Sequence, residues 1–343
     1  MDIVNALTRL CETPAVSGFE RQGATVAAEL LSSCCDSVEI DAFGNIVGMR
    51  RCGKENAKTV LLDAHLDQIG FVVTEVLDGG FLRFAESGGV DPRMLLGCEV
   101  TVLADEPLYG VIACMPPHLM KAGEQDKAVQ IHEMLIDTGL IEAKTRVKTG
   151  TPVVFAERVC QLSKGSVTGK CLDDRAGIIA IAQAMEKLGG EQLSVDVAVL
   201  ISVQEETTSL GAGIGTYRIR PDFAIAVDVG HAKTPDAPSD KTFEYGGGVM
   251  VGMGPNLDTR LTRALIKTAK AEGIAYQQEV MEGHTGTNAW AMQIAAYGTA
   301  QGLLSIPLRY MHTPIESICL SDLDSVSDLL YHFLRNFDGE VRL

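Results

Sequence analysis

DDRAGIIAIAQAMEKLGG (173–190), VDVAVLISVQEE (195–206) and DFAIAVDVG (222–230) follow one another along the chain, and their order decides the fold. The first segment is predicted to be a helix that ends at Gly189 and Gly190. The other two are predicted strands. Strands that alternate with helices indicate a mostly parallel sheet with helices on both faces.

The segments on the N-terminal side continue this alternation. KTVLLDAHLD (58–67) is an almost wholly apolar run, as expected for a strand that is covered on both faces. Residues 2–36 are predicted to form two helices broken by TPAVSGFE (13–20), with Ser17 as a candidate cap of the second. SVEIDAFGNIVGMR (37–50) is predicted to form two strands joined by a turn.

The C-terminal side shows the same alternation of predicted helices and strands. LDTRLTRALIKTAKAEG (257–273) has the pattern of an amphipathic helix, and GTNAWAMQIAAYG (286–298) is also predicted to be helical. GTAQGLLSIPL (298–308) is a predicted strand. The last helix is predicted in SDLDSVSDLLYHFLRNF (321–337), with Ser321 as its N-cap.

A different pattern interrupts this alternation in the first half of the chain. IGFVVTEVLDGGFLRFA (69–85) is a predicted hairpin, and short β-like runs separated by turn residues follow it. This pattern indicates a small β-rich module inserted into a larger α/β domain. We therefore predict residues 1–68 and 162–343 as the larger domain and residues 69–161 as the inserted module.

The composition excludes several classes of protein. The chain has 343 residues, of which 46% are hydrophobic and 22% charged, so it can bury a substantial core. No run approaches about 20 uninterrupted apolar residues, so no membrane span is expected, and the N-terminus lacks the pattern of a signal peptide. The net charge of −16 disfavours a nucleic-acid or anionic-membrane partner. An acidic field suits cationic ligands such as peptide amino termini, and acidity that only keeps the protein soluble is an equal alternative.

The cysteines indicate a reducing environment. There are nine, an odd number with no C-x-x-C pair, and most lie in apolar segments. Small buried thiols in a reducing cytoplasm explain this pattern best, so we expect a cytoplasmic protein. Cys171 is the exception because it lies two residues before Asp173, but a metal-ligand role for it is not favoured.

Five short acidic or histidine-bearing motifs stand at the ends of apolar runs, and four of them follow predicted strands. An open α/β sheet binds its ligands at the carboxyl ends of its strands, where side chains far apart in sequence converge. Imidazoles and carboxylates are the ligands expected for Zn²⁺, Co²⁺ or Mn²⁺, so the sequence predicts a two-metal hydrolase site. The motifs are His65-Leu66-Asp67, Asp173-Asp174, Glu205-Glu206, Asp228 and His312.

His65 and Asp173 each have a second, simpler interpretation. Asp67 lies two residues after His65, on the same side of an extended strand, so its carboxylate can orient the imidazole of a metal ligand. Otherwise His65 is a strand-end residue exposed to solvent. Asp173 can bridge two metals with its two oxygens or cap the helix that follows it, and these roles do not exclude each other.

Glu205 and Glu206 end a buried strand, where two adjacent acids are costly unless a site uses them. One can bind a metal while the other is the general base for a metal-bound water. The alternative is the start of an exposed charged loop. Asp228 and His312 can likewise be capping or solvated residues, and His231 can be a third imidazole or a loop residue beside the site.

Read in order, these pieces resemble the tetrahedral (TET) aminopeptidases, a family of cytoplasmic dinuclear metallopeptidases that includes glutamyl and deblocking aminopeptidases. The matches keep the family's order and approximate spacing from about residue 16 to the C-terminus. The resemblance implies a zinc-peptidase-like catalytic domain, an inserted β-barrel-like dimerisation domain and a hollow tetrahedron of twelve subunits. The matching stretches are AHLDQIGF (64–71), PPHLM (116–120), CLDDRAG (171–177), VQEE (203–206), AVDVGHA (226–232) with TPDAP (234–238), GTNAWAMQ (286–293) and IPLRYMHTPIES (306–317).

The resemblance also implies a role for each motif residue, with two divalent ions (Zn, Co or Mn) per subunit. The implied roles are His65 and Asp228 as terminal ligands of one ion, Asp173 as the bridge, Glu206 and His312 as ligands of the other ion, Glu205 as general base and acid, and Asp67 as the residue that orients His65.

The chain departs from the family pattern at three places beside the site. Gln68 stands where Glu is usual, and Asn288 stands where Asp is common. Residues 207–212 read Thr-Thr-Ser-Leu-Gly-Ala, whereas the family usually has Val-Gly-Leu-Arg-Gly-Ala. None of these changes removes a predicted ligand, so they bear on substrate preference and metal choice.

The sequence thus predicts an aminopeptidase that removes N-terminal residues from short peptides by a metal-activated water, with Glu205 as base. The predicted partners are short peptides with a free N-terminus and further copies of the chain, with no nucleic acid or membrane. The alternatives are a dinuclear carboxypeptidase or amide deacylase, with Arg260 and Arg309 as candidates to bind a substrate carboxylate, and a non-catalytic assembly homologue. The chain has no G-x-S-x-G elbow of a serine hydrolase.

Overall fold

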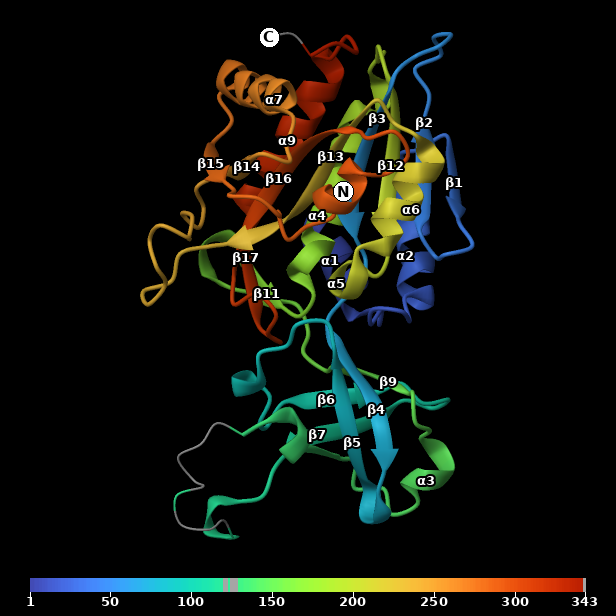
Figure 1. Cartoon of the computed structure of the whole chain (residues 1–343), viewed down its shortest axis with the longest axis vertical. Coiled ribbons are helices and arrows are strands. Elements are labelled where there is room, and N and C mark those ends of the chain that lie inside the picture. The colour runs from blue at the N-terminus through green and yellow to red at the C-terminus, as the bar shows by residue number, and fades with distance from the viewer. Residues whose placement is uncertain (120–122, 124–128, 342–343) are drawn as a thin grey trace.

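The computed structural model describes residues 1–119, 123 and 129–341, which form a large α/β part and a small closed β-barrel (Figure 1). The two ends of the chain build the α/β part, and a segment between them builds the barrel. This confirms the predicted fold class of a mixed, mostly parallel sheet with helices on both faces plus an inserted barrel. Met120 of the PPHLM motif lies outside the described residues.

The large sheet has eleven strands, and its central ones are parallel. β12 pairs with β3, β3 with β13 and β13 with β16 in parallel, and antiparallel strands join this group on both sides. The order is β1-β2-β12-β3-β13-β16-β17-β11-β10, and β14 and β15 branch from β16. The strands are β1 (Ser37–Ile40), β2 (Ile46–Arg50), β3 (Thr59–His65), β10 (Cys160–Gln161), β11 (Ser166–Gly169), β12 (Asp196–Ser202), β13 (Phe223–His231), β14 (Val249–Met253), β15 (Tyr276–Val280), β16 (Ala300–Arg309) and β17 (Glu316–Cys319).

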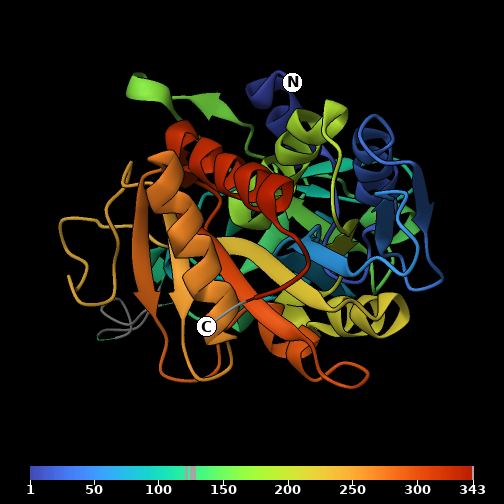
Figure 2. The same cartoon turned by 90° about the horizontal axis from the view of Figure 1, so that it is seen from above.

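Helices cover both faces of this sheet, as the alternation of segments predicted. The larger apolar core lies between the sheet and five helices, of which α7 and α9 run side by side (Figure 2). A smaller core lies against the opposite face, under α6 and α8. The helices are α1 (Ile3–Glu12), α2 (Arg21–Leu31), α4 (Leu172–Lys187), α7 (Thr259–Glu272) and α9 (Leu320–Asn336) on the first face, and α6 (Leu210–Ile219) and α8 (Ala289–Gln293) on the second.

The barrel closes through β4-β5-β8-β7-β6-β9, with β9 paired to β4. Phe71 lies at its centre, and the rings of Phe84 and Phe155 meet it edge-on at 5.0 and 5.2 Å between centroids. The chain leaves the large sheet after β3 and returns to it at β10, and the domain division at residues 69 and 161 stays a prediction. The barrel elements are β4 (Gly70–Val76), β5 (Phe81–Ser87), β6 (Glu99–Val102), β7 (Leu108–Ala113), β8 (Leu135–Asp137) and β9 (Pro152–Phe155), with α3 (Ala143–Arg146) beside them.

The two predicted serine caps were wrong. α2 begins after Glu20, and the hydroxyl of Ser17 instead pairs with that of Thr207 at 2.9 Å. α9 begins at Leu320, directly after β17, so Ser321 already lies in its first turn. In both cases a tertiary contact or an adjoining strand decides where the helix starts.

Two expectations from composition can be compared with the structure. None of the helices in the described part of the chain is long and apolar enough to cross a membrane. All nine cysteines are free thiols, but only Cys11, Cys52 and Cys171 are buried, and Cys160 is exposed. The expectation of small buried thiols therefore holds for only three of the nine.

Candidate active site

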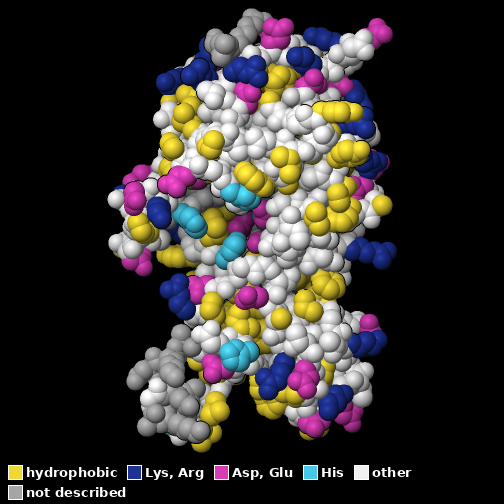
Figure 3. Space-filling model, viewed as in Figure 1, with side chains coloured by type: hydrophobic (Ala, Val, Ile, Leu, Met, Phe, Trp, Pro, Cys, Tyr) yellow, Lys and Arg dark blue, Asp and Glu magenta, His cyan; other side chains and the backbone are white. Residues whose placement is uncertain are grey.

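The predicted site residues surround one cavity of about 430 Å³ at the carboxyl ends of the central parallel strands. Figure 3 shows the hollow, with acidic side chains inside it and histidines around it. β3 ends at His65, β12 leads to Glu205 and Glu206, Asp228 lies in β13, and His312 follows β16. The predicted residues that line the cavity are His65, Asp173, Glu205, Glu206, Asp228 and His312.

Asp173 lies between the two histidines. Its Oδ1 is 3.1 Å from Nε2 of His65, and its Oδ2 is 3.4 Å from Nε2 of His312. Nε2 of His312 is also 3.4 Å from Oε2 of Glu206. Two groups of possible metal ligands therefore share Asp173, and within each group the ligand atoms lie within 4.8 Å of one another: His65, Asp173 and Asp228, and Asp173, Glu206 and His312.

The start of α4 presents Asp173 to the cavity instead of using it as a cap. Cys171 has a left-handed φ of 58°, and neither Asp173 nor Asp174 has helical backbone angles. Asp174 is the residue that caps the helix, because its Oδ1 accepts the backbone N–H of Gly177 at 3.2 Å. Its Oδ2 accepts the backbone N–H of His65 at 3.2 Å, which ties the helix start to the end of β3. The capping interpretation of Asp173 was therefore wrong, because the next residue, Asp174, is the cap.

Asp67 holds the turn that carries the two glutamates. Its fully buried carboxylate accepts the backbone N–H of Glu205 on Oδ1 at 2.9 Å and that of Glu206 on Oδ2 at 3.0 Å. These residues begin the short helix α5 (Glu205–Thr208), so a side chain from the loop after β3 satisfies N–H groups at a helix start. Nδ1 of His65 lies 3.4 Å from Oδ1 of Asp67 and 3.1 Å from its carbonyl oxygen. Asp67 thus contacts both sides of the cavity.

Burial alters the proton affinity of the acids in the cavity. It raises the pKa values of Asp228 and Glu206 well above the ordinary carboxyl range, and it raises the pKa of Glu205 to about 7. Burial also acts to raise the pKa of Asp173, but hydrogen bonds with the two histidine rings outweigh it and hold that pKa below its usual value. Several buried carboxyls at such short range are unfavourable without positive charge. The donor set of imidazoles and carboxylates therefore fits divalent cations of the Zn²⁺, Co²⁺ or Mn²⁺ kind.

Glu316 is a supporting residue that the sequence analysis missed. It is buried in β17, where its Oε2 accepts the backbone N–H of Asp173 at 3.1 Å and its Oε1 accepts that of His312 at 3.0 Å. One carboxylate therefore holds the backbone of residues from both ligand groups. The available signal was an acid four residues after His312, within the stretch IPLRYMHTPIES (306–317).

A second missed feature comes from the segment after barrel strand β5. Gly88 and Gly89 lie so close to the site that a side chain on either would crowd it. A Cβ atom on Gly89 would lie 3.0 Å from Nδ1 of His312, and one on Gly88 would lie 3.3 Å from Cβ of Glu206. Glycine is needed wherever backbone approaches this closely. The segment therefore forms a wall beside the second ligand group.

Gln68, which departs from the family pattern, accepts a hydrogen bond from a buried arginine. Arg175 of α4 is fully buried and donates to the amide oxygen of Gln68 at 2.8 Å and to the carbonyls of Leu10, Thr13 and Leu66. The same amide oxygen accepts the thiol of Cys171 at 2.9 Å, and burial raises the pKa of that thiol to about 11. Cys171 therefore lies outside both ligand groups of the described residues, in line with the sequence.

Asn288, the second departure, lies beneath the site. Its amide group donates to Asp63 of β3 and to Ser202 of β12, each at 2.8 Å. An ionised aspartate here could not donate to Asp63, and a hydrogen bond between the two acids would need one of them to be protonated. The amide therefore joins two neighbouring strands just before the residues that enter the cavity.

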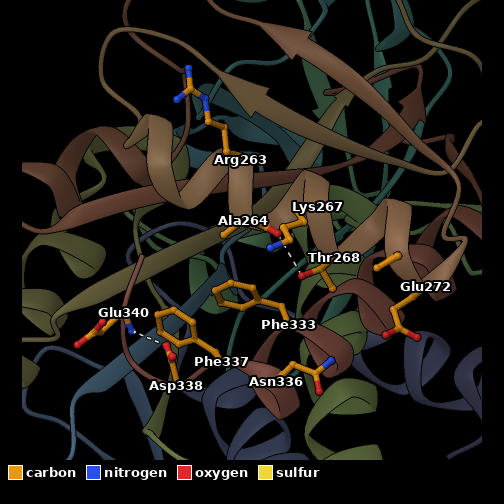
Figure 4. Close-up of a pocket in the computed structure, with 11 residues that line it drawn as sticks. Arg263, Ala264, Lys267, Thr268, Glu272, Phe333, Asn336, Phe337, Asp338 and Glu340 are labelled. Carbon is orange, nitrogen blue, oxygen red and sulfur yellow. Dashed lines mark hydrogen bonds between the residues drawn. The ribbon is translucent and has the colours of Figure 1, made fainter. Parts of the chain in front are cut away.

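His231, the candidate third imidazole, ends β13 and lines this cavity but is in neither of the two ligand groups, whereas the remaining candidates lie away from the cavity. A second hollow, of about 480 Å³, lies between α7 and α9, where Phe333 and Phe337 stack at 4.8 Å (Figure 4). Neither ligand group of the described residues is part of it. Arg260 pairs with Asp258, Arg309 stacks on Tyr245, and neither arginine lines the main cavity.

Comparison with known proteins gives a consistent result over most of the chain. The family model described as M42 glutamyl aminopeptidase matches residues 44–329. The lysyl aminopeptidase of Pyrococcus furiosus is 32% identical over 330 residues, which cover 94% of each chain. Aminopeptidase APDkam598 from Desulfurococcus kamchatkensis has a TM-score of 0.91 at 32% identity, over 98% of this chain and 95% of that one. The Pyrococcus horikoshii TET1 peptidase, which can assemble into a tetrahedron or a large octahedral shell, has a TM-score of 0.85 at 27% identity, over 98% and 100%.

Proposed function

Because this chain belongs to the M42 glutamyl aminopeptidase family and is a peptidase, we propose that it is a metal-dependent enzyme that removes N-terminal residues from short peptides. The observation that carries the metal dependence is the pair of ligand groups that share Asp173. A carboxylate between two histidines, with one oxygen toward each, has the arrangement of a bridge between two cations. We assign the metal ligands as His65 and Asp228 for one ion, Asp173 as the bridge, and Glu206 and His312 for the other.

Two bound divalent ions supply Lewis-acid chemistry, which polarises a carbonyl group and makes a water more acidic. The chain itself supplies the proton transfers. We assign Glu205 as the general base, because it lines the cavity without belonging to either ligand group. With a pKa near 7 through burial, its carboxylate can accept a proton from the attacking water and donate it to the leaving amine.

Asp67 is a positioning residue in this mechanism. Its two hydrogen bonds hold the backbone of the base and of the adjacent ligand, so one carboxylate fixes where this turn lies in the site. The acidic cavity favours the free α-ammonium group of a peptide, which also agrees with the net charge of −16. The exclusion of Arg260 and Arg309 from the cavity wall leaves the carboxypeptidase alternative without its two candidate residues.

We further infer that the chain forms a homo-oligomer, with the inserted barrel as the dimerisation domain and the tetrahedral dodecamer as the expected form. The assembly of the Pyrococcus horikoshii TET1 peptidase supports this inference. A cytoplasmic location is supported by the nine free cysteines, because oxidising compartments favour disulfides.

The test combines metal content with turnover. Purified enzyme should contain about two divalent ions per chain and cleave free aminoacyl anilides but not their N-acetylated forms, and chelation should abolish cleavage. Glu205→Gln should retain both ions and lose at least about a hundredfold in kcat. Glu244→Gln, which removes an exposed carboxylate paired with Lys233, is the matched control and should keep full activity. Cleavage of N-acetylated substrates at the same rate would favour the deacylase, and an active Glu205→Gln variant would refute the assigned base.

A further inference from the structure

Glu279 lies in the wall of the same cavity but belongs to neither ligand group. It is on β15, in the branch of the sheet beyond β16, and no sequence motif marked it. Oε2 of its carboxylate accepts the hydroxyl of Ser305, a fully buried residue of β16, at 2.9 Å. Oε1 lies beside Gly230, where a Cβ atom built on the glycine would be 3.1 Å away. One oxygen of Glu279 therefore accepts a hydrogen bond from the protein, while the carboxylate as a whole lines the cavity.

Among the described residues, no ion pair within 4.0 Å involves Glu279. Lys241 lines the same cavity but does not pair with it at this range. Burial raises its pKa to about 7, and the hydrogen bond from Ser305 opposes that rise. A carboxylate withdrawn from water without a cation is unfavourable. The cavity wall at Glu279 is therefore a place where a positively charged group of a ligand would be stabilised.

The position of Glu279 distinguishes the two positive groups that a peptide can bring. Oε1 of Glu279 lies beside Gly230, which follows Asp228 by two residues in β13 and is therefore roughly 6.6 Å along the strand from that proposed ligand. The α-ammonium group is only two bonds from the scissile carbonyl carbon and must stay close to the ligand groups. The end of a long first side chain can reach further, past Met281 in the cavity wall, against which a methylene stem can pack.

We propose that Glu279 makes the site selective for peptides whose first residue is lysine. This inference rests on the proposed aminopeptidase function and names its substrate class. Because Oε2 is engaged by Ser305, the free oxygen suits a single ammonium donor better than the two parallel N–H groups of a guanidinium. Lysine is therefore preferred over arginine, and both over an uncharged side chain of the same length.

The test compares lysyl, arginyl and norleucyl p-nitroanilides on the metal-loaded enzyme, because norleucine has nearly the same stem as lysine without the charge. The wild-type ratio of kcat/KM for lysyl over norleucyl substrate should be about 10 to 100, the range for a hydrogen bond to a charged group. Glu279→Gln should bring this ratio close to one and leave the norleucyl value nearly unchanged. Glu244→Gln removes the same charge from the exposed surface and should leave the ratio intact.

A binding measurement keeps the proposal testable apart from turnover. Calorimetry with free L-lysine and L-norleucine should show the same selectivity in the wild type and its loss in Glu279→Gln. A wild type without lysine preference, or a variant that loses lysyl and norleucyl turnover equally, would overturn the assignment. If no free N-terminus is cleaved while lysine still binds selectively through Glu279, the proposed peptidase function fails and the cation site stands.

Discussion

Asp67→Asn tests how the two glutamates of the cavity are held. The carboxylate is fully buried, and each of its oxygens accepts one backbone N–H, from Glu205 at 2.9 Å and from Glu206 at 3.0 Å. Asparagine has the same shape but a single oxygen acceptor. One of the two amides must therefore lose its partner and face an NH₂ group.

The size of the effect follows from these two hydrogen bonds. A hydrogen bond to a charged group contributes about 1.5–3 kcal/mol, and a buried donor left unpaired costs about 1–3 kcal/mol. The loss of one bond at Asp67 should thus destabilise the turn that carries the proposed base by about 2–4 kcal/mol. Since 1.4 kcal/mol is a factor of ten, kcat/KM should fall by about 30- to 1000-fold. Metal affinity should fall by about 10- to 100-fold, as for other residues that support ligands.

The assay needs a control that loses a similar backbone contact elsewhere. The buried Asp322 accepts the backbone N–H of Gly246 on Oδ2 and that of Gly248 on Oδ1, each at 2.8 Å, so Asp322→Asn is the matched variant. Both variants should lose stability in thermal unfolding of the metal-free protein. Only Asp67→Asn should lose metal affinity, measured by titration in a metal buffer, and kcat/KM. If Asp67→Asn binds metal and turns over substrate like Asp322→Asn, Asp67 does not organise the site.

Two further predictions concern the wall of the cavity. Gly89→Ala should displace His312, because the added Cβ would lie 3.0 Å from its ring nitrogen, and elemental analysis should then find about one ion per chain instead of two. Gly189→Ala, where a Cβ meets nothing within 4 Å, should keep both ions, and two ions in Gly89→Ala would contradict the crowding argument. With the pKa of Glu279 raised to about 7 by burial, its carboxyl is protonated below that pH, so the lysyl over norleucyl ratio of kcat/KM should fall as the pH drops through about 7. A wild-type ratio that stays level across this range, as it should in Glu279→Gln, would show that the charge of Glu279 is not used.

Most of the architecture could be predicted because its signals are local. The strand before His65 and the helix after Asp174 can each be recognised from the side-chain pattern of a few residues. The starts of helices were harder, because neighbours outside the helix decide them. Ser17 has the chemistry of a cap but is held by Thr207, 190 positions away. Asp174 is preferred to Asp173 as a cap only because of how the chain enters α4.

The candidate site likewise contains residues that local patterns identified and residues that they did not. Every residue that the motifs marked as a ligand or base lines the cavity, because acids and histidines at the ends of parallel strands must converge at one edge of the sheet. Their roles remain proposals. Glu316 and Glu279 were missed because an acid inside a strand segment is indistinguishable from a solvated one until its surroundings are known.

By itself, the sequence determined the order of strands and helices, the inserted β-rich module and the residue types at the edge of the sheet, since each follows from local patterns of side chains. Only the tertiary structure decided which backbone groups Asp67 holds, which glycines approach the ligands and which cavity acid is without an ion pair among the described residues. These contacts join distant parts of the chain, as with Asp67 and Glu205 at 138 positions apart. They depend on the pairing of β3 with β12 and on the packing of the barrel segment against the sheet, and no local pattern of residues encodes either.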